Sequence, residues 1–227
     1  MLEIAQRSSD PNVLAQASCF EAIHNLVRGD STAAQKYAEE SIALTEERGL
    51  ASFSAMATTV NGAALIAQGR YEEGIAGMRR GFSAFRATGA TPQAWYFGLL
   101  ASGLERFGRP QEALDVVEEG LVSVAKTGEQ LSNPGLHQVK GELLLAQNPS
   151  DGAKAEQCFR TAIEIARRQS ARIAELRVTT SLARLLAKQG RRDEARAMLA
   201  EIYDWFTEGF DIAALKNAKA MLDKLNA

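Results

Sequence analysis

A pattern of small residues and turn residues recurs about every forty positions along the chain. In each of five copies a small residue is followed seven positions later by a turn residue, and a second small residue follows the turn. The copies are Ala22, Gly29 and Ala34; Gly62, Gly69 and Gly74; Ala101, Gly108 and Ala113; Gly141, Asn148 and Ala155; and Ala183, Gly190 and Ala195. Repetition of this length is typical of architectures in which each unit stacks on its neighbours.

The residues between the turns have the composition and periodicity of helices. Ala, Leu, Glu and Arg are plentiful and only five prolines occur, which favours helix. Ala113, Val117 and Leu121 illustrate the apolar spacing of one helical face, and glycine is a common cap at helix ends. Each unit is therefore predicted to be two antiparallel helices that bury their apolar faces by stacking on the next pair.

We predict an all-α fold, a right-handed α-α superhelix of about five helix pairs with a C-terminal capping helix, in a single domain over residues 1–227. Asp211 is the expected N-cap of the last helix. The fourth turn, NPSDGAK, is two residues longer than the others. The predicted units are residues 12–49, 50–89, 90–128, 129–170 and 171–208, with the capping helix at 211–226.

The repeated spacing resembles the tetratricopeptide repeat, in which a twelve-residue gap separates two small residues. The resemblance covers five consecutive units, but the period is about 40 residues where that repeat has 34, so we expect longer helices. It implies a non-enzymatic module with a concave groove lined by the first helix of each pair. The groove would bind a protein or peptide segment, or another domain of its own parent chain.

A second resemblance lies in the C-terminal half and includes the phrase YDWFTEGFD. This half resembles the tail of bacterial signalling proteins that join a class III adenylate or guanylate cyclase, or a transcriptional activator, to a predicted NTPase domain. The resemblance implies a regulatory tail. The chain itself contains no G-x-x-x-x-G-K-[ST] phosphate loop.

Composition argues against several classes of partner. The net charge is −2, which gives little attraction to nucleic acid or an anionic membrane, and no apolar run is long enough to span a bilayer. Cys19 and Cys158 are interpreted as small apolar residues in a reducing compartment, so a cytoplasmic location is expected.

No catalytic or metal site is predicted, and we expect neither enzyme activity nor a cofactor. His24 and His137 have no Cys, Asp or Glu at ligand spacing. No Ser or Cys has a base and a third group arranged for nucleophilic catalysis.

One segment, residues 160–196, is strongly basic. It holds ten Lys or Arg and only four acids. A solvated face with intramolecular ion pairs is one interpretation, an acidic protein partner is another, and nucleic acid is a third.

Carrying the groove positions of tetratricopeptide stacks across by alignment predicts a partner-binding surface. Trp and Arg are enriched among interface hot spots, although Trp95 could instead pack between units. Trp205 and Phe206 are expected to seat the last helix. The predicted groove residues are Gln16, Met56, Thr59, Trp95, Ser102, Glu105, Arg106, Gln138, Glu142, Arg177, Thr180 and Arg184.

Two alternative functions stay open. The groove could bind a small molecule or peptide and relay that state to an attached domain. The chain could also form a homo-oligomer through its N-terminal end, because MLEIAQRSS resembles the second helix of a pair whose first helix is missing. Leu2, Ile4 and Ala5 would then need cover from the next unit or from another molecule.

Overall fold

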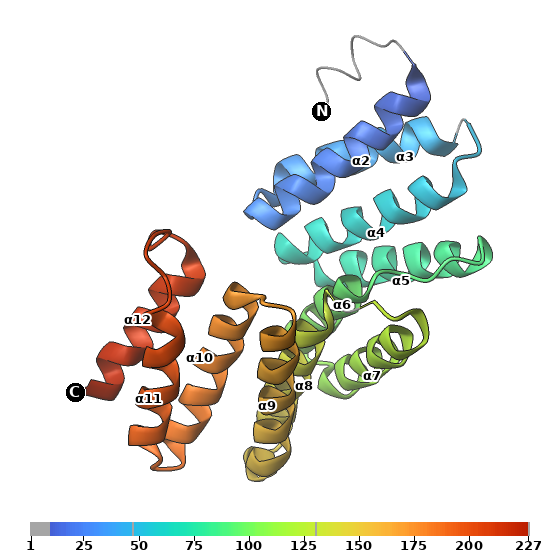
Figure 1. Ribbon diagram of the computed structural model, residues 1–227. Coiled ribbons are helices and arrows are strands. Elements are labelled where there is room, and N and C mark those ends of the chain that lie inside the picture. The colour runs from blue at the N-terminus through green and yellow to red at the C-terminus, as the bar shows by residue number, and fades with distance from the viewer. Residues whose placement is uncertain (1–9, 47, 130, 227) are drawn as a thin grey trace. The chain divides into compact units, whose positions relative to one another are not determined.

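The computed structural model describes residues 10–46, 48–129 and 131–226, and Figure 1 shows that they are almost entirely helical. No strand occurs in these ranges, so the predicted all-α fold is confirmed. In chain order the elements are α2 (Pro11–Arg28), α3 (Ser31–Glu46), α4 (Ala51–Ala67), α5 (Tyr71–Ala87), α6 (Ala94–Arg106), α7 (Pro110–Thr127), α8 (Asn133–Gln147), the 3-10 helix η1 (Pro149–Asp151), α9 (Gly152–Arg168), α10 (Arg172–Lys188), α11 (Arg192–Tyr203) and α12 (Ala213–Asn226).

The chain divides into two compact units, residues 1–116 and 117–227. The N-terminal unit holds the pairs α2/α3 and α4/α5 together with α6. The C-terminal unit holds the pairs α8/α9 and α10/α11 together with α12. The boundary between the units falls inside α7. That residues 1–227 form a single domain stays a prediction.

Glycine turns separate the two helices of most pairs, as the repeat predicts. Gly69 has a left-handed φ of 82°, and the next amide, Arg70 N–H, donates to the Leu65 carbonyl at 2.9 Å, which is the hydrogen bond of a Schellman cap. The fourth turn differs because Asn148 is extended, with φ at −145°. Its side chain accepts from the Ser150 amide, and the extra residues form η1.

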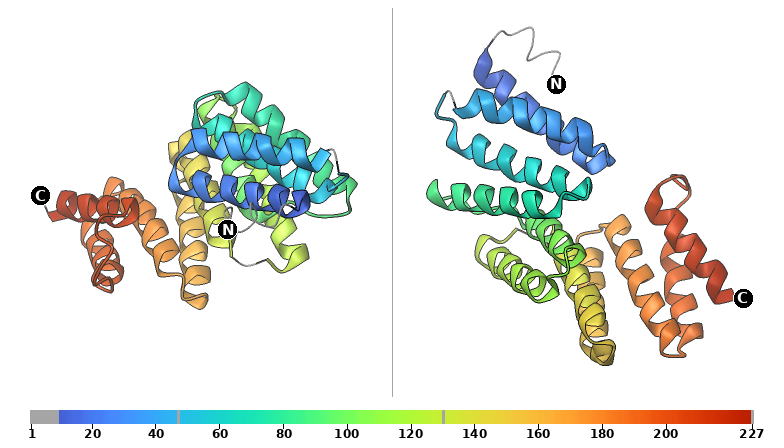
Figure 2. Two further views of the ribbon diagram at one scale, coloured as in Figure 1. Left: turned by 90° about the horizontal axis from the view of Figure 1, so that it is seen from above. Right: turned by 180° about the vertical axis from the view of Figure 1, so that it is seen from behind.

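In the N-terminal unit, small residues allow α4 and α5 to pack closely. A Cβ atom on Gly62 would overlap the backbone of Gly74 and Met78, and one on Gly81 would overlap Thr59. Helices α2 to α5 lie side by side in Figures 1 and 2.

The C-terminal unit has a core built from α9, α10, α11 and α12. Phe159, Leu176 and Leu199 are fully buried in it, and α12 contributes Leu215 and Leu222. Figure 2 shows α10, α11 and α12 side by side, and all three are in mutual contact. The predicted C-terminal helix therefore covers the apolar face of the last pair.

Two local predictions about this end of the chain need correction. Helix α12 begins at Ala213, and Lys216 N–H donates to the Ile212 carbonyl, so Ile212 occupies the N-cap position predicted for Asp211. Phe206 packs against the core as predicted, but Trp205 is 56% exposed. Trp205 therefore does not form part of the hydrophobic seat of α12.

No helix within the described ranges combines the length and the apolar character that crossing a membrane requires.

Candidate binding groove

A polar pocket of about 230 Å³ lies among α8, α10 and α12. It brings together five residues of the predicted groove, because α8 and α10 are the first helices of their pairs and present one face each to the same space. Ser181 on α10 and two residues of α12 complete its wall. The lining residues are Gln138, Glu142, Arg177, Thr180, Ser181, Arg184, Ala214 and Asn217.

A hydrogen-bonded cluster fixes one wall of this pocket. Ser181 Oγ donates to Glu142 Oε1 at 2.8 Å, and Gln138 Nε2 donates to the same oxygen at 3.1 Å. Gln138 Nε2 also lies 3.2 Å from Ser181 Oγ. These contacts join α8 to α10 and hold the Glu142 carboxylate in place.

A second pocket of about 370 Å³ adjoins the first. The two pockets share Glu142, Ser181 and Arg184. The second pocket has an apolar part, to which the fourth turn contributes Pro149. Its other lining residues are Leu145, Phe159, Leu185, Lys188 and Gln189. We call the two adjoining pockets the α10 groove.

The α10 groove carries cations that have no partner in the part of the chain that the structure describes. Arg177, Arg184 and Lys188 are exposed, and none of them has an ion pair or side-chain hydrogen bond within the described ranges. A further recess beside the groove is lined by Arg184, Lys188 and Lys224, among others. The rim of the groove is therefore net positive.

Other cations of the basic segment are paired within the unit. Glu156 contacts both Arg160 and Arg191, each at 2.7 Å. Arg167 and Arg172 bind Glu175. The predicted intramolecular pairing is confirmed for these four arginines. Among the described residues, Arg177, Arg184 and Lys188 on α10 have no such partner, and neither have Arg168 on α9 and Arg196 on α11.

The predicted groove residues of the N-terminal unit differ from one another in exposure. Glu105 and Arg106 are exposed, and Gln16 and Met56 are half-buried. Ser102 is half-buried and donates to the Gly98 carbonyl at 3.0 Å. These five residues stay predictions as a binding surface.

Thr59 has to be removed from the predicted surface. It is 0% exposed, and its hydroxyl donates to the Ala55 carbonyl at 2.8 Å. The α4 face that carries Thr59 packs on α5 at Gly81. Thr180 lines the polar pocket, but like Thr59 it offers little surface to a partner. It is only 5% exposed, and its hydroxyl donates to the Leu176 carbonyl.

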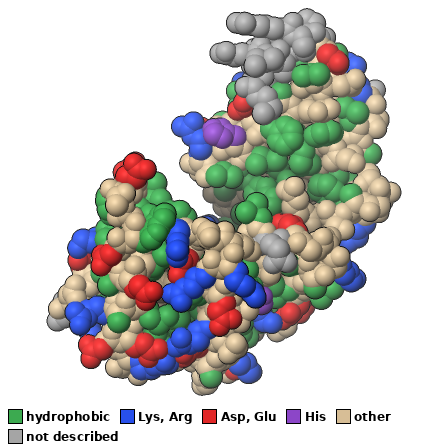
Figure 3. Space-filling view, viewed as in Figure 1, with side chains coloured by type: hydrophobic (Ala, Val, Ile, Leu, Met, Phe, Trp, Pro, Cys, Tyr) green, Lys and Arg blue, Asp and Glu red, His purple; other side chains and the backbone are tan. Residues whose placement is uncertain are grey.

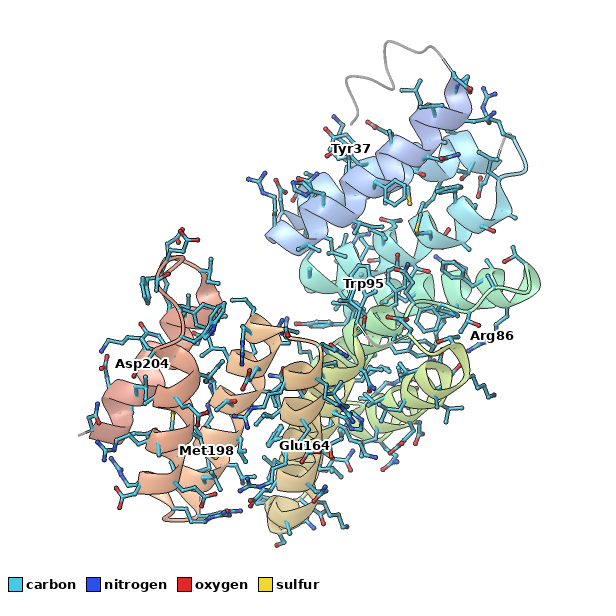
Figure 4. All side chains as sticks on the ribbon, in the orientation of Figure 1. Tyr37, Arg86, Trp95, Glu164, Met198 and Asp204 are labelled. Atoms are coloured by element: carbon cyan, nitrogen blue, oxygen red, sulfur yellow. The ribbon has the colours of Figure 1, made fainter. Side chains whose placement is uncertain are left out.

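Trp95 begins the aromatic triplet Trp95, Tyr96 and Phe97 of α6 and is labelled in Figure 4. Its ring stacks on Tyr96 at a centroid distance of 4.3 Å, and its indole N–H donates to Gln93 Oε1 at 2.9 Å. Tyr96 and Phe97 are buried. The indole is half-buried and is held in a fixed orientation by these two contacts.

Sequence reasoning missed part of the α10 groove. The sequence predicts α12 only as a cap and gives no signal that Ala214 and Asn217 line a pocket. The fourth turn is visible only as an irregularity of the repeat, so the role of Pro149 has no signal either. The signal for Ser181 was its place one residue after Thr180, on a helix whose neighbour carries Gln138 and Glu142 at a spacing of four.

The described residues contain no group of three or more His, Cys, Asp or Glu side chains arranged to hold a metal ion.

Comparison with known proteins identifies the architecture. Residues 176–201, within α10 and α11, match the tetratricopeptide repeat family. A crystal structure of nearly identical TPR-like repeats from Podosopora anserina, described as a kinesin light chain, aligns with a TM-score of 0.62 at 17% identity, covering 95% of this chain and 98% of that one. The fold is tetratricopeptide-like.

Two further structures support the same assignment of the tetratricopeptide-like fold. BtubC (BKLC) from P. vanneervenii aligns with a TM-score of 0.63 at 16% identity, covering 86% of this chain and 87% of that one. The apo form of RapI aligns with a TM-score of 0.62 at 11% identity, covering 93% and 82%. A search of curated proteins gave no significant sequence match. At these identities the TM-scores show a shared fold.

Proposed function

We propose that this chain is a non-enzymatic interaction module that binds a segment of a partner protein along the α10 groove. The observation that carries the proposal is the adjoining pair of pockets with Arg184 in the wall of both. Arg184 is exposed and has no ion pair or side-chain hydrogen bond to any residue that the structure describes. Ligand sites in proteins combine concave apolar surface with a few oriented polar groups. The α10 groove has both.

The chemistry of the groove favours a segment with an acidic residue near an apolar one. Arg184 and Lys188 stand beside the apolar wall formed by Leu145, Phe159 and Leu185. A carboxylate can accept two parallel hydrogen bonds from an arginine, and an apolar side chain can bury itself in the larger pocket. The Glu142 carboxylate would repel an acidic residue of the segment placed next to it. This repulsion limits the positions in which the segment can lie along the groove.

Selection from a random peptide library displayed on phage tests this proposal. We expect the enriched peptides to carry Asp or Glu next to a large apolar residue. Arg184→Glu is expected to weaken their binding at least about tenfold, because a buried or central charge pair contributes 2 kcal/mol or more. Arg196→Glu is the matched control, since Arg196 is exposed on α11 and lines neither pocket.

Two outcomes would contradict the proposal. One is a selection that enriches no peptide over an unrelated helical protein. The other is a set of peptides whose affinity is the same for the wild type and for Arg184→Glu, because these peptides would bind elsewhere.

We also propose that the module is the regulatory tail of a bacterial signalling protein, with the groove controlling an attached domain. The support is the resemblance of the C-terminal sequence, including YDWFTEGFD, to such tails. Sequencing the gene on both sides of this chain tests the idea. An adjoining cyclase, NTPase or DNA-binding domain in the same reading frame is expected, and a reading frame without any of them would overturn it.

A further inference from the structure

The turn between α11 and α12, residues 204–212, exposes large apolar side chains that the core does not use. Trp205 is 56% exposed, Phe210 is 47% exposed and Ile212 is 39% exposed. This concentration within nine residues contrasts with the burial of the apolar residues on the inner face of α12. Figure 3 shows hydrophobic side chains next to acidic ones where this turn reaches the surface.

Both exposed rings are held in place by rings that are anchored in the unit. Trp205 meets the edge of Phe206 at a centroid distance of 5.0 Å, and Phe210 lies 6.0 Å from Tyr203. Phe206 and Tyr203 pack against the core. The guanidinium of Arg172 lies 5.5 Å from the Trp205 ring. An exposed aromatic surface that is already ordered loses little conformational entropy when it binds.

The same turn is strongly acidic. Asp204, Glu208 and Asp211 are exposed, and none of them has an ion pair or side-chain hydrogen bond within the described ranges (Asp204 is labelled in Figure 4). Residues 204–211 contain no Lys, Arg or His. Arg172, whose guanidinium lies over the Trp205 ring, already donates to Glu175 at 2.9 Å. The aromatic surface is therefore bordered by three uncompensated carboxylates.

We propose that this turn is a docking surface for a basic amphipathic segment of a partner protein. Apolar side chains of the segment would cover Trp205 and Phe210, and Lys or Arg side chains would pair with the carboxylates. Charge complementarity decides the occupant: two copies of this turn facing each other would bring six carboxylates together, and like charges across an interface cost several kcal/mol. The α10 groove has the opposite charge, so the two surfaces select different partners.

A model peptide with the repeated sequence Leu-Lys-Lys-Leu-Leu-Lys-Leu tests the proposal directly. The chain has two tryptophans, so Trp95→Phe leaves Trp205 as the only one. Titration of the peptide into this variant at low salt is expected to change the Trp205 emission. A twin peptide with Glu in place of Lys is expected to bind at least about tenfold more weakly, because its charges repel the turn.

Two variants separate the aromatic and the acidic contributions. In fluorescence anisotropy with labelled peptide, Trp205→Ala is expected to weaken binding at least about tenfold, as for a tryptophan hot spot. The triple variant Asp204→Asn, Glu208→Asn and Asp211→Asn is expected to weaken binding about tenfold at low salt and to flatten its salt dependence. Neither variant removes a core side chain, and thermal unfolding by circular dichroism checks that each remains folded.

Matched controls lie elsewhere on the chain. Phe107→Ala removes another exposed aromatic residue, 41% exposed on the N-terminal unit. The triple change Glu46→Gln, Glu72→Gln and Glu164→Gln removes the same charge from three exposed positions. Both are expected to bind the peptide as the wild type does.

Several results would overturn the proposal. The first is no binding of the basic peptide to the wild type. The second is binding as tight as that of the wild type by Trp205→Ala or by the acid-to-amide triple variant, and the third is binding of the acidic twin as tight as that of the basic peptide. The fourth is loss of binding in Arg184→Glu, which would place the peptide in the α10 groove. A Trp205-dependent dimer in light scattering would assign the surface to a second copy and would overturn the proposed occupant.

Discussion

Arg167 Nε donates to Glu175 Oε1 at 2.6 Å, and the glutamate is only 2% exposed. Arg172 Nη1 binds the other carboxylate oxygen at 2.9 Å. A buried carboxylate with two charged donors ties the end of α9 to the start of α10. Removing one partner of such a group usually costs more than the pair contributes, because a charge is left without compensation.

We therefore expect Glu175→Gln to lower the free energy of unfolding by about 1–3 kcal/mol. The amide keeps the shape of the side chain but loses the charge and places an N–H₂ group against one arginine. Urea denaturation followed by circular dichroism measures the change. Glu164→Gln on the exposed face of α9 should stay within about 0.5 kcal/mol of the wild type, and an equal loss in both variants would refute the role of Glu175.

Glycines in the two units should respond in opposite ways to the same substitution. A Cβ on Gly81 would overlap Thr59 and the α4 backbone, so Gly81→Ala is expected to cost about 2 kcal/mol or more through overpacking. Gly135 in α8 has nothing within 4 Å of its Cβ position. Gly135→Ala is expected to add about 0.5–1 kcal/mol by raising helix propensity. The denaturant midpoints of the two variants and the wild type measure these changes. A higher midpoint for Gly81→Ala than for the wild type would disprove the close packing of α4 on α5.

Stability should fall with acidification through the Glu156 cluster. Burial acts to raise the pKa of the Glu156 carboxyl, but hydrogen bonds from Arg191 and Arg160 outweigh it, so the pKa lies below its ordinary value. A lowered pKa in the folded state gives stability that is complete above the unfolded-state pKa of about 4.3 and is lost as the pH falls through the folded-state pKa. Unfolding free energies measured between neutral pH and strong acid should show this loss.

Glu156→Gln provides the test of that assignment. The variant should be about 1 kcal/mol less stable than the wild type at neutral pH, and the difference should shrink as the pH falls below the folded-state pKa. Glu164→Gln should keep the wild-type acid profile. A constant difference between Glu156→Gln and the wild type at every pH would show that the carboxylate charge plays no part.

The two free thiols should differ in reactivity. Cys19 is 0% exposed, and burial raises its pKa to about 12 against an opposing hydrogen bond with Ser41. Cys158 is half-buried, and burial raises its pKa as well. Because the thiolate is the reactive form, Cys19 is expected to react with a chromogenic disulfide only when the unit opens, at least about tenfold more slowly than Cys158. The single variants Cys19→Ala and Cys158→Ala assign the two phases, and comparable rates in the folded protein would contradict the burial of Cys19.

The repeat predicted the helix pairs well because turn glycines and small residues are local signals. Gly29, Gly69, Gly108 and Gly190 all have the left-handed φ that a helix end requires. Within the groove, Gln138, Glu142, Arg177 and Arg184 could be predicted because they share positions on the first helices of two successive pairs. Those positions are expected from the resemblance to tetratricopeptide stacks, carried across by alignment.

The rest required three-dimensional packing. Thr59 is buried because α5 packs closely against it. Gly81 allows this close packing, but a glycine in the sequence does not by itself predict it. The exposure of Trp205 depends on how the chain leaves α11, which ends two residues earlier at Tyr203, and the sequence pattern does not show on which side of the turn the ring lies. Spacing of three or four residues indicates the pairs Arg160–Glu156 and Arg172–Glu175. The pair of Arg191 with Glu156 joins segments 35 residues apart, and no local spacing indicates it.

The fourth turn breaks the repeat, and Pro149 of that turn forms part of the wall of the larger pocket. In a stacked-helix protein the buried faces are constrained by both neighbours, whereas a turn at the edge is constrained by neither. Length variation at such a turn gives a route by which new ligand preferences can arise while the stack keeps its stability. The position where this chain is least regular is therefore where its selectivity can diverge most freely from that of other helix-pair proteins.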